Sequence, residues 1–395
     1  MNSTASNTHR NVGLLAACQA MLFTNNATLI AINGLAGLAL APNATLATLP
    51  VTCWVIGGAI ATMSASQYMK KVGRQAGLFR GASIGILGAL ICASAVWMAN
   101  FWLLCFGAIV FGTFNAFGQY YRFVAAEVSP PDFRATAVSL VLAGGLVGGI
   151  LGPTTSRWTV DLIGPRFTGA YLALIVFVLV TMLILSRIRV PDLSAAEQAA
   201  TGRPMAEIAR QPRYIVAVMA GAISYGVMNF LMTSTPIAMG VCGHPYGDAA
   251  FVISSHVVAM FAPSFVTGPL IKRFGVVPVM LAGAALNIAA IAIALAGVAV
   301  ANFWWSMVLL GVGWNFLYIG ATNLLTETYR PEERAKAQGT NETAIFVMMA
   351  VSSFSSGMIV TNAGWDKVNY AATPLIAVVI AALAFLYFNT RQART

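Results

Sequence analysis

Long apolar stretches, each about as long as a membrane-spanning helix, follow one another along almost the whole chain. A helix of about 20 apolar residues is needed to cross a bilayer core of about 30 Å. The stretches lie at residues 12–37, 46–69, 77–98, 101–124, 135–158, 167–187, 213–239, 248–271, 276–299, 302–326, 337–361 and 368–389. This pattern predicts an all-α membrane protein with twelve transmembrane helices.

One long polar segment separates the first six stretches from the last six. Residues 189–212 therefore predict a cytoplasmic linker between two six-helix bundles, residues 1–188 and 213–395. The halves also share residues at a constant offset, which predicts a duplicated six-helix unit. The matches are Glu127, Pro131, Arg134, Ala135 and Ala137 with Glu327, Pro331, Arg334, Ala335 and Ala337.

The basic residues predict the orientation, because Lys and Arg near helix ends are retained on the cytoplasmic side of a membrane. With both termini in the cytoplasm, all of the 22 Lys and Arg residues except Arg157, Arg166 and Lys367 fall in cytoplasmic segments. The net charge of +10 is dispersed over many helix ends. It indicates topology in a lipid bilayer, and no nucleic-acid partner is expected.

Composition excludes a soluble enzyme. The chain is 58% hydrophobic and only 9% charged, whereas about 25% of the residues in a soluble domain are charged. Its five cysteines form no CxxC pair and predict no disulfide framework. The polar N-terminus predicts no removable signal peptide. No arrangement of a nucleophile and a base is present, so neither catalysis nor a cofactor is expected.

Two short segments resemble the loop signature of the major facilitator superfamily. They are Gly268-Pro-Leu-Ile-Lys-Arg-Phe-Gly275 and Ser66-Gln-Tyr-Met-Lys-Lys-Val-Gly-Arg74, although both have Lys where the family usually has an acid. Together with the repeat, the resemblance covers nearly the whole chain and implies a secondary transporter that works by alternating access. Gly148 and Gly152 resemble half of a drug-antiporter pattern, but we interpret them as helix packing.

The acidic residues bear on how transport is driven. All twelve Asp and Glu residues are expected in loops or near helix ends, with none at the centre of the bilayer. A group that couples transport to protons must be reachable from both sides of the membrane. Carboxylate-based proton coupling is therefore not expected.

His256 is the one histidine inside an apolar stretch, and an ionisable group there is a functional candidate. Met260 follows it by four residues, and Met228 and Met232 are four apart on the preceding stretch, so each pair shares a helix face. Both pairs lie at matching distances from the loop near His244. Three thioethers and an imidazole could therefore converge on one Cu(I) ion, which prefers soft ligands such as thioether sulfur. The methionines could equally be packing residues, and the histidine could bind a carbonyl or a substrate ring.

The spacing of these pairs resembles the MxxxM and HxxxM motifs of the CcoA-type copper importers. The resemblance implies that Met228, Met232, His256 and Met260 bind copper as the transported substrate, for cytochrome oxidase assembly, in the bacterial inner membrane. Near the outer face, Cys242, His244 and Cys53 could capture the ion first or control it through thiol chemistry. Copper chaperones or thiol reductants would then be partners.

The alternative is a transporter of riboflavin or another aromatic metabolite, because riboflavin carriers are related to the copper importers. A planar polar ring system needs stacking surfaces and hydrogen-bonding groups. The candidates are Trp54, Tyr120, Tyr121, Trp314, Tyr318, Asn115, Asn315 and Gln119. Most such aromatic residues could instead be interfacial or packing residues. A membrane sensor or an assembly chaperone is a further possibility, but it has no added soluble domain to support it.

Overall fold

The computed structural model describes residues 2–43, 46–188, 190 and 202–392. These residues form helices and connecting turns, with no β-strand among them. Much of the predicted linker, namely residues 189 and 191–201, lies outside the described residues. The all-α prediction is confirmed.

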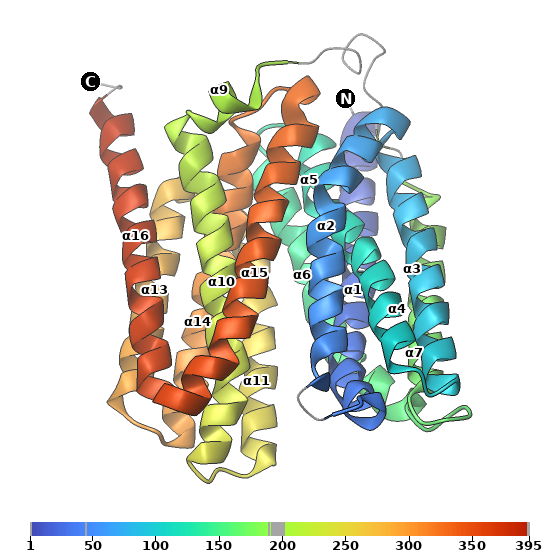
Figure 1. Cartoon of the computed structure of the whole chain (residues 1–395). Coiled ribbons are helices and arrows are strands. Elements are labelled where there is room, and N and C mark those ends of the chain that lie inside the picture. The colour runs from blue at the N-terminus through green and yellow to red at the C-terminus, as the bar shows by residue number, and fades with distance from the viewer. Residues whose placement is uncertain (1, 44–45, 189, 191–201, 393–395) are drawn as a thin grey trace. The chain divides into compact units, whose positions relative to one another are not determined.

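The long helices follow the predicted apolar stretches in order along the chain, and two of the stretches are each divided into two helices (Figure 1). In the first half they are α1 (Asn2–Leu40), α2 (Leu49–Val72), α3 (Arg74–Trp97), α4 (Phe101–Gly118), α5 (Tyr121–Glu127), α6 (Arg134–Thr159) and α7 (Thr168–Leu185). In the second half they are α9 (Met205–Ala209), α10 (Pro212–Val241), α11 (Tyr246–Phe261), α12 (Ser264–Phe274), α13 (Val276–Ala296), α14 (Val300–Thr326), α15 (Arg334–Ala363) and α16 (Trp365–Gln392). A short 3₁₀ turn, Pro331–Glu333, precedes α15.

Eleven helices in the described part are long and apolar enough to span a membrane, and α11 with α12 forms a twelfth span bent by 40°. The bend was not predicted. It lies at Pro263, whose ring lacks the backbone N–H that would continue the helical hydrogen bonding. The fourth span, Phe101–Glu127, is interrupted by a turn at Gln119 and Tyr120, between α4 and α5.

Two glycines end equivalent helices in the two halves. Gly73 after α2 and Gly275 after α12 both have φ of +87°, a conformation that side chains other than glycine rarely adopt. Each lies in a segment that resembles the superfamily signature. Glycine at these positions therefore allows an abrupt turn from one span into the next.

The described helices form two compact units. Unit 1 comprises Met1–Pro130, Leu140–Gly202 and Arg330–Phe346, and unit 2 comprises Pro131–Ser139, Arg203–Tyr329 and Val347–Thr395. In unit 1, α4 packs on both α2 and α3, whereas α13 and α14 pack together in unit 2. Gly148 confirms the packing interpretation, because a Cβ there would lie 2.6 Å from the backbone nitrogen of Thr24 in α1.

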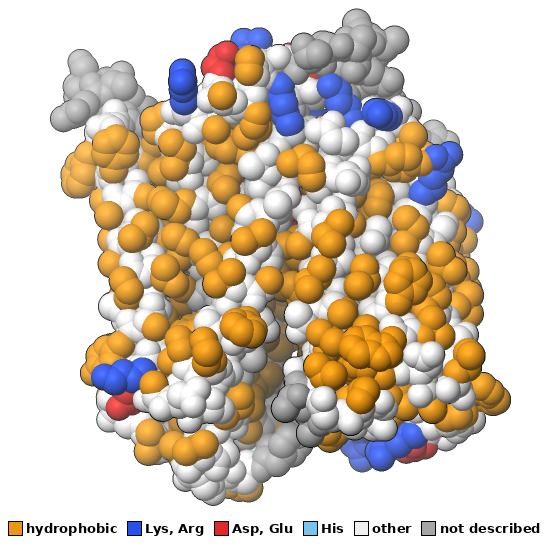
Figure 2. Space-filling view, viewed as in Figure 1, with side chains coloured by type: hydrophobic (Ala, Val, Ile, Leu, Met, Phe, Trp, Pro, Cys, Tyr) orange, Lys and Arg blue, Asp and Glu red, His pale blue; other side chains and the backbone are white. Residues whose placement is uncertain are grey.

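The outer surface of the helices suits a lipid environment. Large apolar side chains such as Trp158, Val241 and Phe354 are exposed, and Figure 2 shows apolar side chains along the middle of the helices with Lys and Arg gathered toward their ends. Exposed apolar surface of this extent would aggregate in water. The chain is therefore a multi-pass membrane protein.

Candidate functional site

The predicted copper ligands lie in unit 2 on the adjacent helices α10 and α11. Met228, His256 and Met260 are buried, whereas Met232 is partly exposed. The described residues contain no group of three or more His, Cys, Asp and Glu side chains that could hold a metal. A copper site here would therefore depend on the thioethers, and it stays a prediction.

His256 is held in one orientation by the backbone of α14. Its Nδ1 lies 2.7 Å from the carbonyl oxygen of Met307. Because a carbonyl only accepts hydrogen bonds, Nδ1 donates the proton and Nε2 keeps a lone pair. This Nε2 is buried and has no hydrogen-bond partner among the described residues. It is an unused acceptor inside a membrane span.

The predicted capture residues do not form one cluster with that set. Cys242 is the C-cap residue of α10, and its free thiol is exposed. The His244 Nε2 donates to the carbonyl oxygen of Val298, 2.7 Å away. Cys53 lies in unit 1, where it is a buried free cysteine on α2. Their roles in metal capture stay predictions.

An aromatic cluster occupies the core of unit 2. The rings of Trp314 and Tyr318 on α14 are stacked with centroids 4.8 Å apart, and Tyr225 of α10 meets both edge-on. Phe261 of α11 meets Trp314 edge-on as well. The Trp314 Nε1 is buried without a hydrogen-bond partner in the described residues. The cluster thus combines ring surface with an unused donor.

Asn315 next to this cluster has a structural task. Its Nδ2 donates to the carbonyl oxygen of Met260 and to the Oγ of Ser264, both at 2.6 Å. Its Oδ1 accepts from the hydroxyl of Thr267, also at 2.6 Å. Pro263 lacks a backbone donor and interrupts the helix at the bend. The bonds of Asn315 hold both α11 and α12 against α14 at this point. Asn315 is therefore occupied by protein groups.

Unit 1 contains a chain of buried polar side chains that sequence analysis found only in part. Asn115 Oδ1 accepts from the amides of Asn26 and Gln119, at 2.9 and 3.2 Å. Arg122 then donates to both the backbone and the side-chain oxygen of Gln119. Asn26 Oδ1 is a buried acceptor without a partner in the described part of the chain.

The other predicted aromatic residues of unit 1 are packed into its core. Trp54, Tyr120 and Tyr121 are all buried. The hydroxyl of Tyr120 donates to the backbone oxygen of Thr62, 2.9 Å away. Trp54 Nε1 has no hydrogen-bond partner among the residues described.

The polar chain ends in a buried ion pair. Arg122 of α5 binds Glu342 of α15, and Asn341 donates to the same carboxylate oxygen at 2.7 Å. The second oxygen, Oε2, is buried without a hydrogen-bond partner among the described residues. The expectation that every acid lies in a loop or near a helix end is wrong for Glu342, which lies about 12 Å along α15 from Arg334.

A second ionic cluster joins the ends of three helices in unit 1. Arg74 at the start of α3 binds both oxygens of Glu127, at 2.6 and 3.1 Å. Arg334 at the start of α15 binds the same carboxylate at 3.0 Å, and Gln338 bridges Arg74 and Glu127. In this protein, Glu127 therefore provides a negative charge for two guanidinium groups.

One signal in the sequence could have identified the buried pair. At the offset that relates the two halves, Glu342 corresponds to Leu142 and Arg122 to Thr322. Each charge thus breaks the repeat, although the surrounding helices are equivalent. A charge that only one copy of a repeat retains inside a span indicates a specific role.

The pattern of helices and signature segments agrees with the comparison with known families. The model of the Major Facilitator Superfamily matches residues 14–263 and 219–395. The chain belongs to the major facilitator superfamily. A relative from Brucella anthropi, named riboflavin transporter RfnT, is 38% identical over 382 residues, which are 96% of each chain. The Bacillus subtilis protein YddS, an uncharacterized MFS-type transporter, is 28% identical over 88% of this chain and 84% of its own.

Solved structures show the same fold. The MFS transporter FucP, in an outward conformation, superposes with a TM-score of 0.74 at 19% identity, covering 95% of this chain and 98% of its own. The human organic anion transporter MFSD10 gives a TM-score of 0.76 at 10% identity, covering 95% and 99%. The family model thus confirms the predicted superfamily, and the solved structures confirm its fold.

Proposed function

We propose that this protein transports riboflavin or a closely related flavin across the bacterial inner membrane. The observation that carries the proposal is the 38% identity to a riboflavin transporter over 96% of both chains. An alignment of that extent includes all the predicted spans of both halves. It supports the flavin alternative more than the copper prediction.

The side chains of both units suit the chemistry of a flavin. A flavin combines a planar ring system, which stacks on aromatic rings, with polar edges and hydroxyls that need hydrogen-bond partners. Within unit 2, the aromatic cluster around Trp314 has an unused Nε1 donor. Within unit 1, the carboxamides of Asn26, Asn115 and Gln119 form a separate polar group with an unused acceptor on Asn26.

The charge distribution supports an orientation in the membrane. The Lys and Arg residues favour both termini in the cytoplasm. We infer uptake into the cell by alternating access of the two six-helix halves, residues 1–188 and 213–395. No bond is made or broken in the substrate during such a cycle.

Uptake of labelled riboflavin by bacteria that lack their own carrier tests this function. Cells with the protein should accumulate riboflavin saturably above cells with an empty vector, and unlabelled flavins should compete. The test variant is Trp314→Ala, compared at the same membrane level. It removes the central ring of the aromatic cluster and should reduce uptake. Uptake no higher than in empty cells, with the protein present in the membrane, would refute the proposal.

Copper import is the second candidate, because one observation favours it. The buried lone pair on His256 Nε2 is unused, and Met228 and Met260 are buried on the same two adjacent helices. Radioactive copper uptake by the same cells separates the candidates. Copper accumulation that requires the protein, together with no riboflavin uptake, would replace the flavin proposal.

A further inference from the structure

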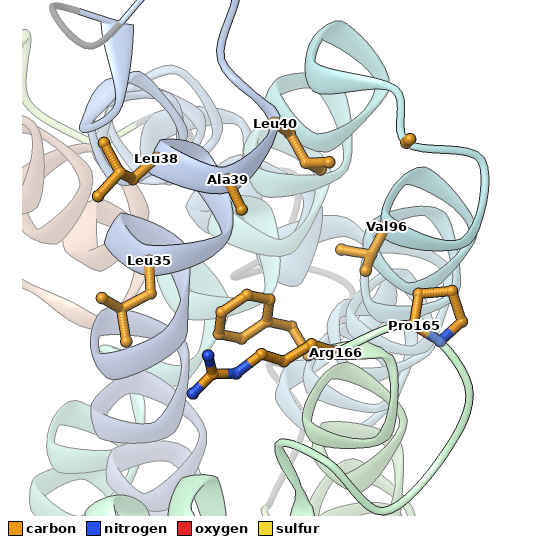
Figure 3. Close-up of a pocket in the computed structure, with 9 residues that line it drawn as sticks. Leu35, Leu38, Ala39, Leu40, Val96, Pro165 and Arg166 are labelled. Atoms are coloured by element: carbon orange, nitrogen blue, oxygen red, sulfur yellow. The ribbon is translucent and has the colours of Figure 1, made fainter.

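A groove in unit 1 lies apart from both candidate sites. Its volume is 480 Å³, which is within the range of small-molecule pockets. Its walls come from the end of α1, the turn between α3 and α4, and the turn before α7. Figure 3 shows Leu35, Leu38 and Leu40 of α1 on one wall and Val96 and Pro165 across from them. The groove is therefore almost wholly apolar.

The position of the groove, at the ends of spans, suits the level where lipid headgroups meet acyl chains. It is formed where spans end, and the rings of Trp97 and Trp158 near those ends are exposed. Tryptophan is enriched at membrane interfaces because its ring is apolar and its N–H is polar. Leu35 and Leu38 on the groove wall are also exposed, which suits contact with acyl chains. An occupant that enters here would come from the bilayer.

One lining residue carries a charge. Arg166 extends across the groove from the turn before α7 toward the wall that contains Leu35 (Figure 3). Its guanidinium lies 5.3 Å from the ring centroid of Phe167, and its Nε is 3.4 Å from Asp161 in an exposed ion pair. Such an exposed pair is weak, so a phosphate can compete for the guanidinium.

The turns that form the groove are held in uncommon backbone conformations. Ala99 has φ of +50° and Phe167 has φ of +80°, and both line the groove. Among the described residues, these two are the non-glycine positions with positive φ. Such conformations persist only where the surroundings enforce them, and they concentrate at ligand sites. The Phe167 N–H donates to the Val160 carbonyl at 2.7 Å, which fixes this turn.

We propose that the groove binds an anionic glycerophospholipid, with an acyl chain along the apolar walls and the phosphate on Arg166. An apolar groove with one cation at its mouth matches an amphiphile with one anionic end. Arg166 is also one of three basic residues outside the predicted cytoplasmic segments. This proposal does not depend on the transported substrate.

Native mass spectrometry of the detergent-purified full chain tests it, with phosphatidylglycerol and phosphatidylcholine of identical acyl chains as probes. Phosphatidylglycerol should remain bound several-fold more than phosphatidylcholine. Arg166→Gln should abolish this preference, whereas Arg157→Gln, the matched control outside the groove, should retain it. Ala39→Trp should fill the groove and reduce retention of both lipids.

Three results of the retention measurements would overturn the proposal. They are equal retention of the two lipids by the unaltered protein, a preference that survives in Arg166→Gln, or an equal loss in Arg157→Gln. Displacement of phosphatidylglycerol by soluble glycerol phosphate at matched concentration would also overturn it, because the site would then bind a free anion.

Discussion

Arg122 on α5 and Glu342 on α15 form an ion pair whose side chains are 1% and 0% exposed. Both lie within membrane-spanning segments. Removing two charges from water is costly, and their attraction repays the cost only when the pair is complete and further hydrogen bonds assist it. Gln119 and Asn341 supply such bonds.

Breaking this pair should destabilise the protein strongly. Glu342→Ala leaves the Arg122 guanidinium buried without its counter-charge, which costs about 3–5 kcal/mol. We expect a clear drop in the melting temperature of the detergent-purified protein. Replacing both residues with Met should cost less than Glu342→Ala alone, because no charge is then left unpaired.

The exposed pair of Arg213 and Glu327 provides the control. Its side chains are each 47% exposed, and exposed pairs contribute only about 0–1 kcal/mol. Glu327→Ala should therefore change the melting temperature much less than Glu342→Ala. Equal effects of the two substitutions would contradict the importance of burial.

Glu342 also changes what is expected of the driving force. A buried carboxylate with an unused oxygen, linked to a polar chain, is the kind of group through which transporters bind protons. Riboflavin uptake into proteoliposomes should increase with an inward-directed proton gradient. Glu342→Gln keeps the shape but cannot ionise, so it should remove that response. A response of equal size in Glu342→Gln would rule out Glu342 as the coupling group.

The number and order of the spans could be predicted, because apolar length and charged helix ends are local features of the chain. The sequence also indicated the repeat. Gly73 and Gly275, at equivalent helix ends of the two halves, share the same positive φ. The break in the repeat marks Arg122 and Glu342 individually, but their contact could not be predicted, because the two residues are 220 positions apart. The same limit applies to Asn315, which resembled a substrate ligand until its partners on α11 and α12 were visible.

Asn315 should be required for the bend between α11 and α12. Asn315→Ala removes the bonds to Met260, Ser264 and Thr267, and each polar group left unpaired costs about 1–3 kcal/mol. Backbone amides around Pro263 should exchange their hydrogens faster. Asn323→Ala is the control, since Asn323 donates to the Ile319 carbonyl within its own helix and its loss should leave the bend unchanged.

Glu327 should give the stability a small dependence on pH. Glu327 is half-exposed, and the partial burial of its carboxyl raises its pKa above the ordinary value, while the Arg213 guanidinium offsets part of that rise. A carboxyl with a raised pKa binds more protons in the folded state, so its stabilising effect at low pH is lost as pH rises through the folded pKa. In melting curves above about pH 4.3, the ordinary pKa of a glutamate, Glu327→Gln should gain stability relative to the unaltered protein.

His256 allows its two ring nitrogens to be tested separately. The Nδ2 of an asparagine can take the place of Nδ1, which donates to the Met307 carbonyl, whereas a glutamine extends to the position of Nε2. We expect His256→Asn to retain the melting temperature and riboflavin uptake, because the hydrogen bond to α14 is preserved. His256→Gln should lose that bond, at a cost of about 0.5–1.5 kcal/mol.

The copper candidate requires a different result, because the metal would need the Nε2 lone pair that asparagine lacks. In that case copper uptake would be present in the unaltered protein and absent in His256→Asn at the same membrane level. Since His256→Asn keeps the bond to Met307, a structural defect would not explain the loss. Riboflavin uptake that is normal in His256→Asn, with no copper uptake in either protein, would show that His256 acts by holding α11 against α14.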